Sequence, residues 1–373
     1  MVEWMRRVWR LLAGDSLVLA LCRVVLVLAL LGAGALAFVA AGLVPVAASE
    51  GHWAVTRVLL QFTMRSSVRT RTLGIQPPPL DGPDLLPKAA GHYATACMAC
   101  HGAPGEPRAL VVRGMTPEPP FLPGGFDGLR DRELFWIVRH GIKYTAMPAW
   151  PAQDRVDEVW AMVAFLRELP GMDAATFQAL ANGEHAGIDL APGTLADCER
   201  CHGRDGMGRP GIPRLAGQEE AYLRASLAAF ADGRRHSGIM QPVAAELDAG
   251  EIDRLAAHFA GLAGRSGDAA CAGPEAAGRG AVLARHGDPD RKIPACNACH
   301  GRAAGDRNPM YPDLGGQHAD YLSAQLELFR ERSRGGTDHV PLMHSASKRL
   351  TDRDIRDLAG YYAALPWGCP VQG

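Results

Sequence analysis

A long apolar segment near the N-terminus dominates the hydropathy pattern of the chain. From Val24 to Ala48 it carries no charged residue over 25 positions. A helix of that length is about 37 Å long, which is enough to cross a hydrocarbon core of about 30 Å. Arg23 would be costly at the bilayer centre, so the span is expected to begin just after it. The pattern predicts that residues 1–48 form a cytoplasmic N-terminus and a transmembrane anchor.

A cleaved signal peptide is the alternative interpretation of this segment. Val46, Ala47 and Ala48 resemble the small residues of a cleavage site. The apolar run is much longer than the core of a signal peptide, which spans about 7 to 15 residues, and this favours a retained anchor. Arginines lie on both sides of the run, so charge alone does not set its orientation (Arg6, Arg7, Arg10 and Arg23 before it; Arg57, Arg65, Arg69 and Arg71 after it).

Residues 49–83 combine an amphipathic segment with a proline-rich linker. Between His52 and Ile75, apolar residues are interleaved with arginines. Two interpretations fit this pattern: a helix lying among lipid headgroups, or an ordinary amphipathic helix packed on the first folded domain. Three prolines at positions 77–79 then end any helix and begin a stiff linker that runs to about Pro87.

A pentapeptide with two cysteines and a histidine occurs three times beyond the linker. Two thiols one helical turn apart can both form thioethers with one porphyrin, and the next histidine reaches the iron, so this is the attachment signature of a c-type haem. A zinc ribbon would pair its cysteines about 15 to 20 residues apart, whereas neighbouring motifs here lie 101 and 98 residues apart. We therefore expect three covalently attached haem c groups (held by Cys97 and Cys100, Cys198 and Cys201, and Cys296 and Cys299, with His101, His202 and His300 as iron ligands).

The first motif stands in a segment that resembles class I cytochromes c, from about Ala89 to Pro170. Gly91 and Tyr93 precede the cysteines at about the place where that family lets its first helix cross its last helix closely. Apolar spacing predicts the last helix at Val156–Leu169. The resemblance implies a methionine ligand in the loop before this helix. Met147 occupies that place, 46 residues after His101; a core methionine that fills a gap is the alternative role, and Met115 and His140 are the alternative ligands.

The second and third motifs belong to an internal repeat. Five residues recur at a fixed offset of 99 (Pro213, Gly217, Gln218, Tyr222 and Leu223 as Pro312, Gly316, Gln317, Tyr321 and Leu322). Each unit is expected to place a glycine- and proline-rich loop before a helix that begins near the Gly-Gln pair. A loop carrying Met240 or Met343 follows, and then a final helix, at Asp248–Leu262 or Thr351–Leu365.

This repeated pair resembles the dihaem cytochrome c4 family, whose two haem domains pack against each other. The resemblance implies Met240 and Met343 as the second iron ligands. It also implies that the backbone carbonyls of Pro213 and Pro312 orient the proximal histidines through the other ring nitrogen, although tight turns alone would account for the prolines. At the third site His339 and His344 compete with the methionine, and Met207 and Met310 lie too near their own cysteines to be preferred.

Three cysteines lie outside the motifs. Cys22 is expected to be a small buried residue at the membrane edge. Cys271 and Cys369 are candidates for a disulfide, which would close a loop of about 98 residues and stabilise the fold by roughly 4 to 5 kcal/mol in the chain-entropy model. Two free thiols are the alternative.

Together these features predict an all-α fold, with three class I cytochrome c domains in tandem behind one N-terminal transmembrane helix. The expected domains are residues 84–183, 184–264 and 265–373, which suits a chain of 373 residues. Haem is attached to cysteines outside the bacterial cytoplasm. The haem domains are therefore expected in the periplasm, on a single-pass protein of the bacterial inner membrane.

The predicted function is electron transfer. The chain has 39 basic and 40 acidic residues, so nothing indicates a nucleic-acid partner, and no hydrolase triad, P-loop or dinucleotide motif appears; no small-molecule substrate is expected. We expect redox protein partners, with electrons passing between a quinol-oxidising complex and a terminal oxidase. The alternatives are an electron-accepting cytochrome subunit of a periplasmic dehydrogenase and, less favoured, a haem peroxidase, which would need an open sixth position on one iron.

Overall fold

The computed structural model describes residues 3, 5, 17–126, 128–183, 195–262, 278–301 and 307–366. In these ranges the regular structure is helical apart from isolated bridges, which confirms the all-α prediction. The chain divides into two compact units, one comprising Met1–Arg57 with Gly114–Pro117 and the other Val58–Arg113 with Glu118–Gly373. The second unit contains all three cysteine motifs. Cys271 and Cys369 lie outside the described residues.

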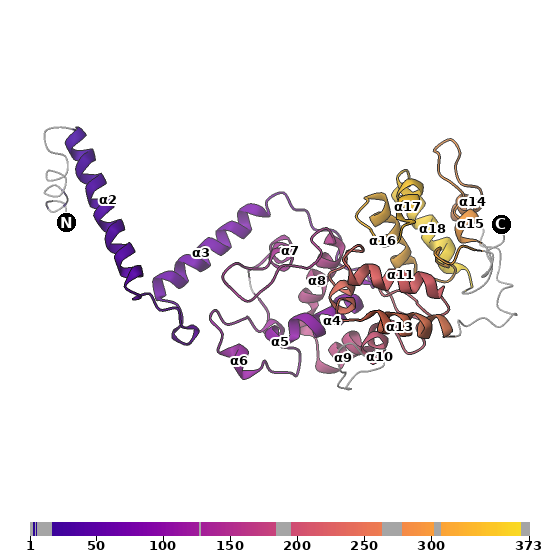
Figure 1. Cartoon of the computed structure of the whole chain (residues 1–373), viewed down its shortest axis with the longest axis horizontal. Coiled ribbons are helices and arrows are strands. Elements are labelled where there is room, and N and C mark those ends of the chain that lie inside the picture. The colour runs from indigo at the N-terminus through magenta and orange to yellow at the C-terminus, as the bar shows by residue number, and fades with distance from the viewer. Residues whose placement is uncertain are drawn as a thin grey trace. The chain divides into compact units, whose positions relative to one another are not determined.

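The first unit is built on helix α2, Leu17–Ala40 (indigo in Figure 1), followed by the short helix η1, Ala48–Glu50. At 24 residues α2 is about 36 Å long, and its hydropathy of 2.4 over Val18–Ala40 is high enough to cross a membrane. A signal sequence near the N-terminus can also meet these criteria of length and composition.

The predicted bounds of this span were wrong at both ends. The helix starts seven residues earlier and includes Arg23, because a charge raises the cost of membrane insertion without breaking a helix. It ends at Ala40 rather than at Ala48, since Gly42 takes a positive φ of 71° and Pro45 cannot continue a helix. Cys22, predicted to be buried, is exposed on α2, because none of the apolar window Val18–Ala40 is buried by the described residues.

The first motif lies among short helices that surround the central α8. The helices that follow η1, up to residue 183, are α3 Ala54–Arg71, α4 Leu85–His92, η2 Tyr93–Cys97, α5 Met98–His101, α6 Leu110–Arg113, η3 Leu122–Gly124, α7 Asp131–His140, α8 Val156–Glu168, η4 Leu169–Gly171 and α9 Ala174–Asn182. Helix α8 therefore ends one residue before its predicted end. Helix α4 packs on α8 and α9, and α7 also packs on α8.

An aromatic cluster lies where the first and last helices of this stretch meet. The buried Tyr93 ring lies 5.2 Å from Phe165 of α8 and 6.1 Å from Phe177 of α9, and its hydroxyl donates to the Gly102 carbonyl at 2.6 Å. Tyr93 thus takes the expected place. Gly91 does not make room for α8: a Cβ there would lie 3.0 Å from the Sγ of Cys201, in the second motif. The small residue instead allows a neighbouring repeat to approach.

From the helix that carries the cysteine motif onward, the two repeats have the same order of helices in the part of the chain that the structure describes. The second stretch contains α10 Leu195–His202, α11 Glu220–Ala231, α12 Met240–Ala244 and α13 Ala249–Gly261; the third contains α14 Arg279–His286, α15 Asn297–His300, α16 Ala319–Arg330, α17 Val340–Ser347 and α18 Asp352–Ala364. Figure 1 shows α11 beside α13 and α16 beside α18. Met240 begins α12 and Met343 lies inside α17, so both methionines stand on short helices rather than in the predicted loops.

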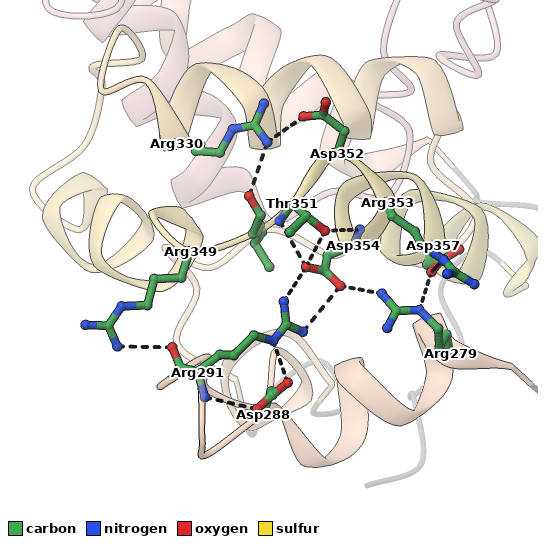
Figure 2. A network of polar contacts seen from close by, with 11 residues as sticks. Arg279, Asp288, Arg291, Arg330, Arg349, Thr351, Asp352, Arg353, Asp354 and Asp357 are labelled. Atoms are coloured by element: carbon green, nitrogen blue, oxygen red, sulfur yellow. Dashed lines mark hydrogen bonds and ion pairs between the residues drawn. The ribbon is translucent and has the colours of Figure 1, made fainter.

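A buried carboxylate holds the start of α18. Asp354 is fully buried and accepts hydrogen bonds from Arg291 Nη1 at 2.7 Å and from the backbone N–H and hydroxyl of Thr351 at 2.9 and 2.7 Å. Arg279 donates to the same carboxylate at 2.5 Å, so α14, α18 and the loop after α14 are joined at one point (Figure 2).

Candidate functional site

The histidines of the two repeats are oriented by the same backbone contact. Nδ1 of His202 donates to the carbonyl of Pro213 at 3.0 Å, and Nδ1 of His300 donates to the carbonyl of Pro312 at 2.9 Å. These are the hydrogen bonds expected from the resemblance. Because Nδ1 carries the proton, Nε2 is left with a free lone pair for a metal ion. Burial lowers the pKa of both imidazoles, which favours the neutral form that binds metals.

The first motif has an equivalent contact that the sequence did not reveal. Nδ1 of His101 donates to the carbonyl of Pro120 at 2.9 Å, and burial likewise lowers the pKa of His101. Pro120 lies 19 residues after its histidine, whereas the prolines of the repeats lie 11 and 12 residues after theirs. It also follows Pro119 directly, so neither repeat alignment nor spacing distinguishes it.

One cavity of about 770 Å³ joins the second and third motifs. Its volume falls in the range of roughly 300 to 1,000 Å³ that is usual for cofactor sites. All the predicted attachment and iron-binding residues of both repeats line it (Cys198, Cys201, His202 and Met240; Cys296, Cys299, His300 and Met343). The structure therefore brings these two predicted sites together around a shared space.

Two arginines that line this cavity were not predicted. Arg235 and Arg334 are 99 positions apart, at the same place in each repeat, and both line the cavity. The guanidinium of Arg235 lies 4.4 Å from the ring centroid of Phe230, and that of Arg334 lies 4.3 Å from that of Phe329. The repeated spacing of five residues from phenylalanine to arginine was the signal that would have revealed them.

The two arginines bring positive charge to the cavity wall. Arg235 donates to the Tyr321 hydroxyl at 3.1 Å and Arg334 donates to the Tyr222 hydroxyl at 3.2 Å, so each reaches into the other repeat. Although burial alone would raise the pKa of Tyr222, the two cations lower it to about 8. The Nε atom of Arg334 is buried with no hydrogen-bond partner. Guanidinium groups on the wall of the cavity that also holds the attachment cysteines fit the two carboxylates of a haem.

Paired glutamines connect the two repeats on the proximal side. Gln218 accepts from the backbone N–H of Asp313 at 2.8 Å and donates to its carbonyl at 3.1 Å. Gln317 makes the same two contacts with the backbone of Arg214, both at 3.0 Å. Asp313 and Arg214 each follow the proline that orients a histidine. The repeated Gly-Gln pair therefore fixes the two histidine-orienting loops relative to each other.

The residues of the first motif do not line this cavity. Cys97 packs against the core of its own stretch, and burial raises the pKa of its thiol to about 12. Met147 lies in the turn between α7 and α8, as predicted, where its backbone N–H donates to the Thr145 hydroxyl at 3.1 Å. Its carbonyl accepts from the Ile142 N–H at 3.3 Å.

The alternative ligands differ in their surroundings. His344 is engaged elsewhere, with Nε2 2.9 Å from the Arg334 carbonyl, and it does not line the cavity. His339 and Met310 both line the cavity, and His339 lies edge-on to Tyr311 with centroids 5.2 Å apart. At the first site His140 contacts Trp136, with centroids 4.9 Å apart. Position alone therefore keeps His339 as an alternative to Met343, and it adds Met310, which the sequence did not favour.

Comparisons with known proteins find cytochromes c among the relatives of this chain. Residues 85–166 match the family described as cytochrome c oxidase, cbb3-type, subunit III, and residues 291–365 match the cytochrome c family. The thiosulfate dehydrogenase electron acceptor of Thiomonas intermedia is 39% identical over 194 residues, which are 52% of this chain and 89% of that protein. Cytochrome c4 of Pseudomonas aeruginosa is 35% identical over 185 residues, 48% of this chain and 90% of that protein. A solved cytochrome c4 from Acidithiobacillus ferrooxidans is 34% identical with a TM-score of 0.40, and the match covers 46% of this chain and 99% of that one.

Proposed function

Because the chain belongs to the cytochrome c family, with a half of the cytochrome c4 type, we propose that it holds three covalent haem c groups and carries single electrons at a membrane. It is an electron-transfer protein rather than an enzyme. The observation that carries the proposal is the shared cavity, where two attachment motifs with identically oriented histidines meet. The haems supply reversible one-electron chemistry.

The protein's own residues hold and tune these groups. His101, His202 and His300 bind iron from the proximal side, and the backbone carbonyls of three prolines fix their rings. Met147, Met240 and Met343 provide thioether ligands, which raise the reduction potential relative to a second histidine. If a histidine and a methionine both bound each iron, no position on it would be left for a substrate. This would account for electron transfer in place of peroxidase chemistry.

The proposed location is the periplasmic side of the bacterial inner membrane. Helix α2 is long and apolar enough to act as a single-pass anchor, and haem attachment requires the cysteines to lie outside the cytoplasm. The three haem domains are taken as residues 84–183, 184–264 and 265–373, each built around its own motif.

A respiratory carrier is the first of two candidate roles. In this role the protein takes electrons from a quinol-oxidising complex and delivers them to a terminal oxidase. The match of residues 85–166 to the family described as cytochrome c oxidase, cbb3-type, subunit III supports this role.

Electron acceptance from a periplasmic dehydrogenase is the second candidate role. It is supported by the relatives that are named thiosulfate dehydrogenase electron acceptors, at 39% identity in two organisms. The two roles share the same haems and differ in the electron donor.

Rapid-mixing kinetics with the full-length protein in detergent distinguishes these roles. The oxidised protein is mixed with thiosulfate and a thiosulfate dehydrogenase, or with a quinol-oxidising complex and quinol, and haem reduction is followed optically. Faster reduction by one donor assigns the role, and reoxidation by a terminal oxidase is expected in both. An absence of reduction by either donor, or peroxide consumption by the reduced protein, would contradict the proposed function.

A further inference from the structure

The segment just before Met240 packs against the part of the chain around the first motif, residues 84–183, which we call the first stretch. His236, Ser237, Gly238 and Ile239 belong to the second repeat, yet Ile239 packs against the hydrophobic core around Tyr93 and Phe165. Ser237 is 3% exposed. The conformation of the Met240 segment therefore depends on residues from another stretch of the chain.

A single buried carboxylate organises this contact. Glu158, in the first turn of α8, is 4% exposed. One of its oxygens accepts from the Ser237 hydroxyl at 2.6 Å and lies 2.9 Å from Arg155 Nη1. The other accepts from the Gly238 N–H at 2.6 Å and from Trp150 Nε1 at 3.3 Å. Two donors come from each stretch, so the carboxylate joins them with charge-assisted hydrogen bonds.

The contact continues to the backbone of Met240. The Ser237 oxygen that donates to Glu158 also accepts from the N–H groups of Met240 at 3.0 Å and Ile239 at 3.2 Å. The first N–H groups of a helix have no partner within it. Ser237 supplies that partner at the start of α12, and Glu158 fixes the direction in which the Ser237 hydroxyl points.

Neighbouring contacts hold the same segment in place. Arg155 donates to the His236 carbonyl at 2.8 Å, and His236 Nδ1 lies 2.6 Å from an oxygen of Asp154. Any Cβ at Gly238 would overlap the indole ring of Trp150. Trp150 itself lies three residues after Met147. The segments that carry the first and second methionines thus pack on each other.

The described residues of the third repeat show no arrangement of this kind before Met343. The residues just before Met343 are exposed, with Leu342 at 57%. The Met343 carbonyl accepts from Ser347 Oγ at 2.8 Å, within its own helix α17. Met240 is therefore the repeat methionine whose segment rests on the first stretch.

We propose that Glu158 is a positioning residue for the second haem: through Ser237 and Gly238 it holds Met240 in place to bind iron. This inference rests on the proposed function, because it takes Met240 as a ligand. Its consequence is that the potential of the second haem depends on the first stretch, so the three centres are not independent modules.

The test compares variants of the full-length, haem-loaded protein. Met240→Ala first identifies the second haem, by its loss of the far-red absorption that accompanies methionine ligation and by the fall of one potential. Glu158→Gln keeps the volume, but its amide cannot accept all four hydrogen bonds. Ser237→Ala removes the bridging hydroxyl, and Ser237→Thr retains it. Glu133→Gln is the matched control, since Glu133 is also 4% exposed and bonds to Arg130 in its own stretch.

We expect Glu158→Gln and Ser237→Ala to shift the one-electron equilibrium of the second haem at least tenfold toward the oxidised form. This shift corresponds to a reduction potential lower by about 59 mV. Both should also weaken the far-red band, while the number of covalent haems and the other two potentials stay unchanged. Ser237→Thr and Glu133→Gln should resemble the wild type.

The outcomes separate the two levels of inference. If Met240→Ala changes neither the band nor a potential, the ligand assignment itself is wrong. If Met240→Ala behaves as expected but the Glu158 and Ser237 variants leave the second potential unchanged, the positioning role is overturned. Equal shifts at all three haems would indicate general destabilisation and would also overturn it.

Discussion

Met343 provides the most direct check on a single ligand, because it shares the cavity with Met310 and His339. We expect Met343→Ala to keep its covalent haem and to lower the reduction potential of the third centre, since water or a histidine is a weaker stabiliser of ferrous iron than a thioether. Redox titration resolves a tenfold change in the one-electron equilibrium, about 59 mV. Met310→Ala is the matched control, and a shift in that variant alone would reassign the ligand.

Asp354 is expected to make a large contribution, for a single side chain, to the free energy of unfolding of the third stretch. Replacing it with asparagine weakens the bonds to Arg291 and Arg279 and the cap of α18, and should lower the free energy of unfolding by about 2 to 4 kcal/mol. Asp352→Asn is the control, since that carboxylate is 69% exposed and should contribute less than about 1 kcal/mol. Equal losses in denaturant titrations of the two variants would contradict this prediction.

The same residue predicts a pH dependence. Although burial alone would raise the pKa of Asp354, hydrogen bonds from Arg291, Thr351 and Arg279 hold it well below its usual value of 3.8. A carboxyl with a depressed pKa contributes its full stabilisation above the unfolded pKa of about 4, and the contribution is lost as the pH falls through the folded pKa. The stability difference between wild type and Asp354→Asn should therefore be largest near neutral pH and shrink below about pH 4.

At the scale of residues, a contact could be predicted from the sequence where the residues that make it recur in both repeats. Pro213 and Pro312 could be predicted because they recur at one offset beside recurring histidines. Pro120 could not, because its spacing from His101 is different. Glu158 could not either, since an acidic residue in the first turn of a helix is ordinary on helix-dipole grounds alone, and its partners lie about 80 positions away.

At the scale of elements, predicted helix ends were accurate where a local cap defines them. Helices α13 and α18 begin directly after Asp248 and Thr351, whose side chains close capping boxes with Glu251 and Asp354. Helices α12 and α17 were predicted as loops. They have only five and eight residues, and helices this short depend on tertiary contacts that a local pattern does not contain.

Helix α2 leads to a prediction about membrane attachment. A retained helix of this length and hydropathy should keep the protein in membranes through high-salt and carbonate washes. Mature protein should begin near Met1 in N-terminal sequencing. A protein that washes free and begins near Ser49 would show that the segment is a cleaved signal peptide.

Helix α3 leads to a separate prediction. Its early apolar residues Val58, Leu59 and Phe62 are more than half exposed, and within this helix Val68 near its end is the buried residue. Packing on the folded domain therefore does not explain why Val58, Leu59 and Phe62 are apolar. We expect these three side chains to contact lipid. A fluorophore attached at Phe62→Cys in liposome-reconstituted protein should report an apolar environment. The same label at Tyr144→Cys is the control, because Tyr144 is 81% exposed. Water-like emission from the label at both positions would contradict the prediction.

At the scale of the whole molecule, three attachment motifs predict three covalent haems. Denatured protein should retain all three through acid-acetone extraction, because thioether bonds survive loss of the fold. Two or fewer haems in fully matured protein would refute this reading. The predicted bond between Cys271 and Cys369 stays a prediction; a non-reducing digest should yield one linked peptide.

The contacts between stretches were the part of the molecule least accessible from the sequence. Repetition predicted that two similar domains would lie together, and the glutamine pairs agree with that arrangement. Nothing in the pattern indicated that the first stretch would bind the Met240 segment, because Ser237 and Gly238 read as ordinary turn residues. Such contacts depend on surfaces that exist only after each stretch has folded.

The proximity of Gly91 and Cys201 bears on the biogenesis of the protein. Helix α4 lies so close to the second attachment site that even a methyl group at position 91 would touch the Cys201 sulfur. Cys201 nevertheless stays partly exposed and lines the shared cavity. Haem would therefore have to reach this thiol from the cavity, because α4 closes one side of the sulfur.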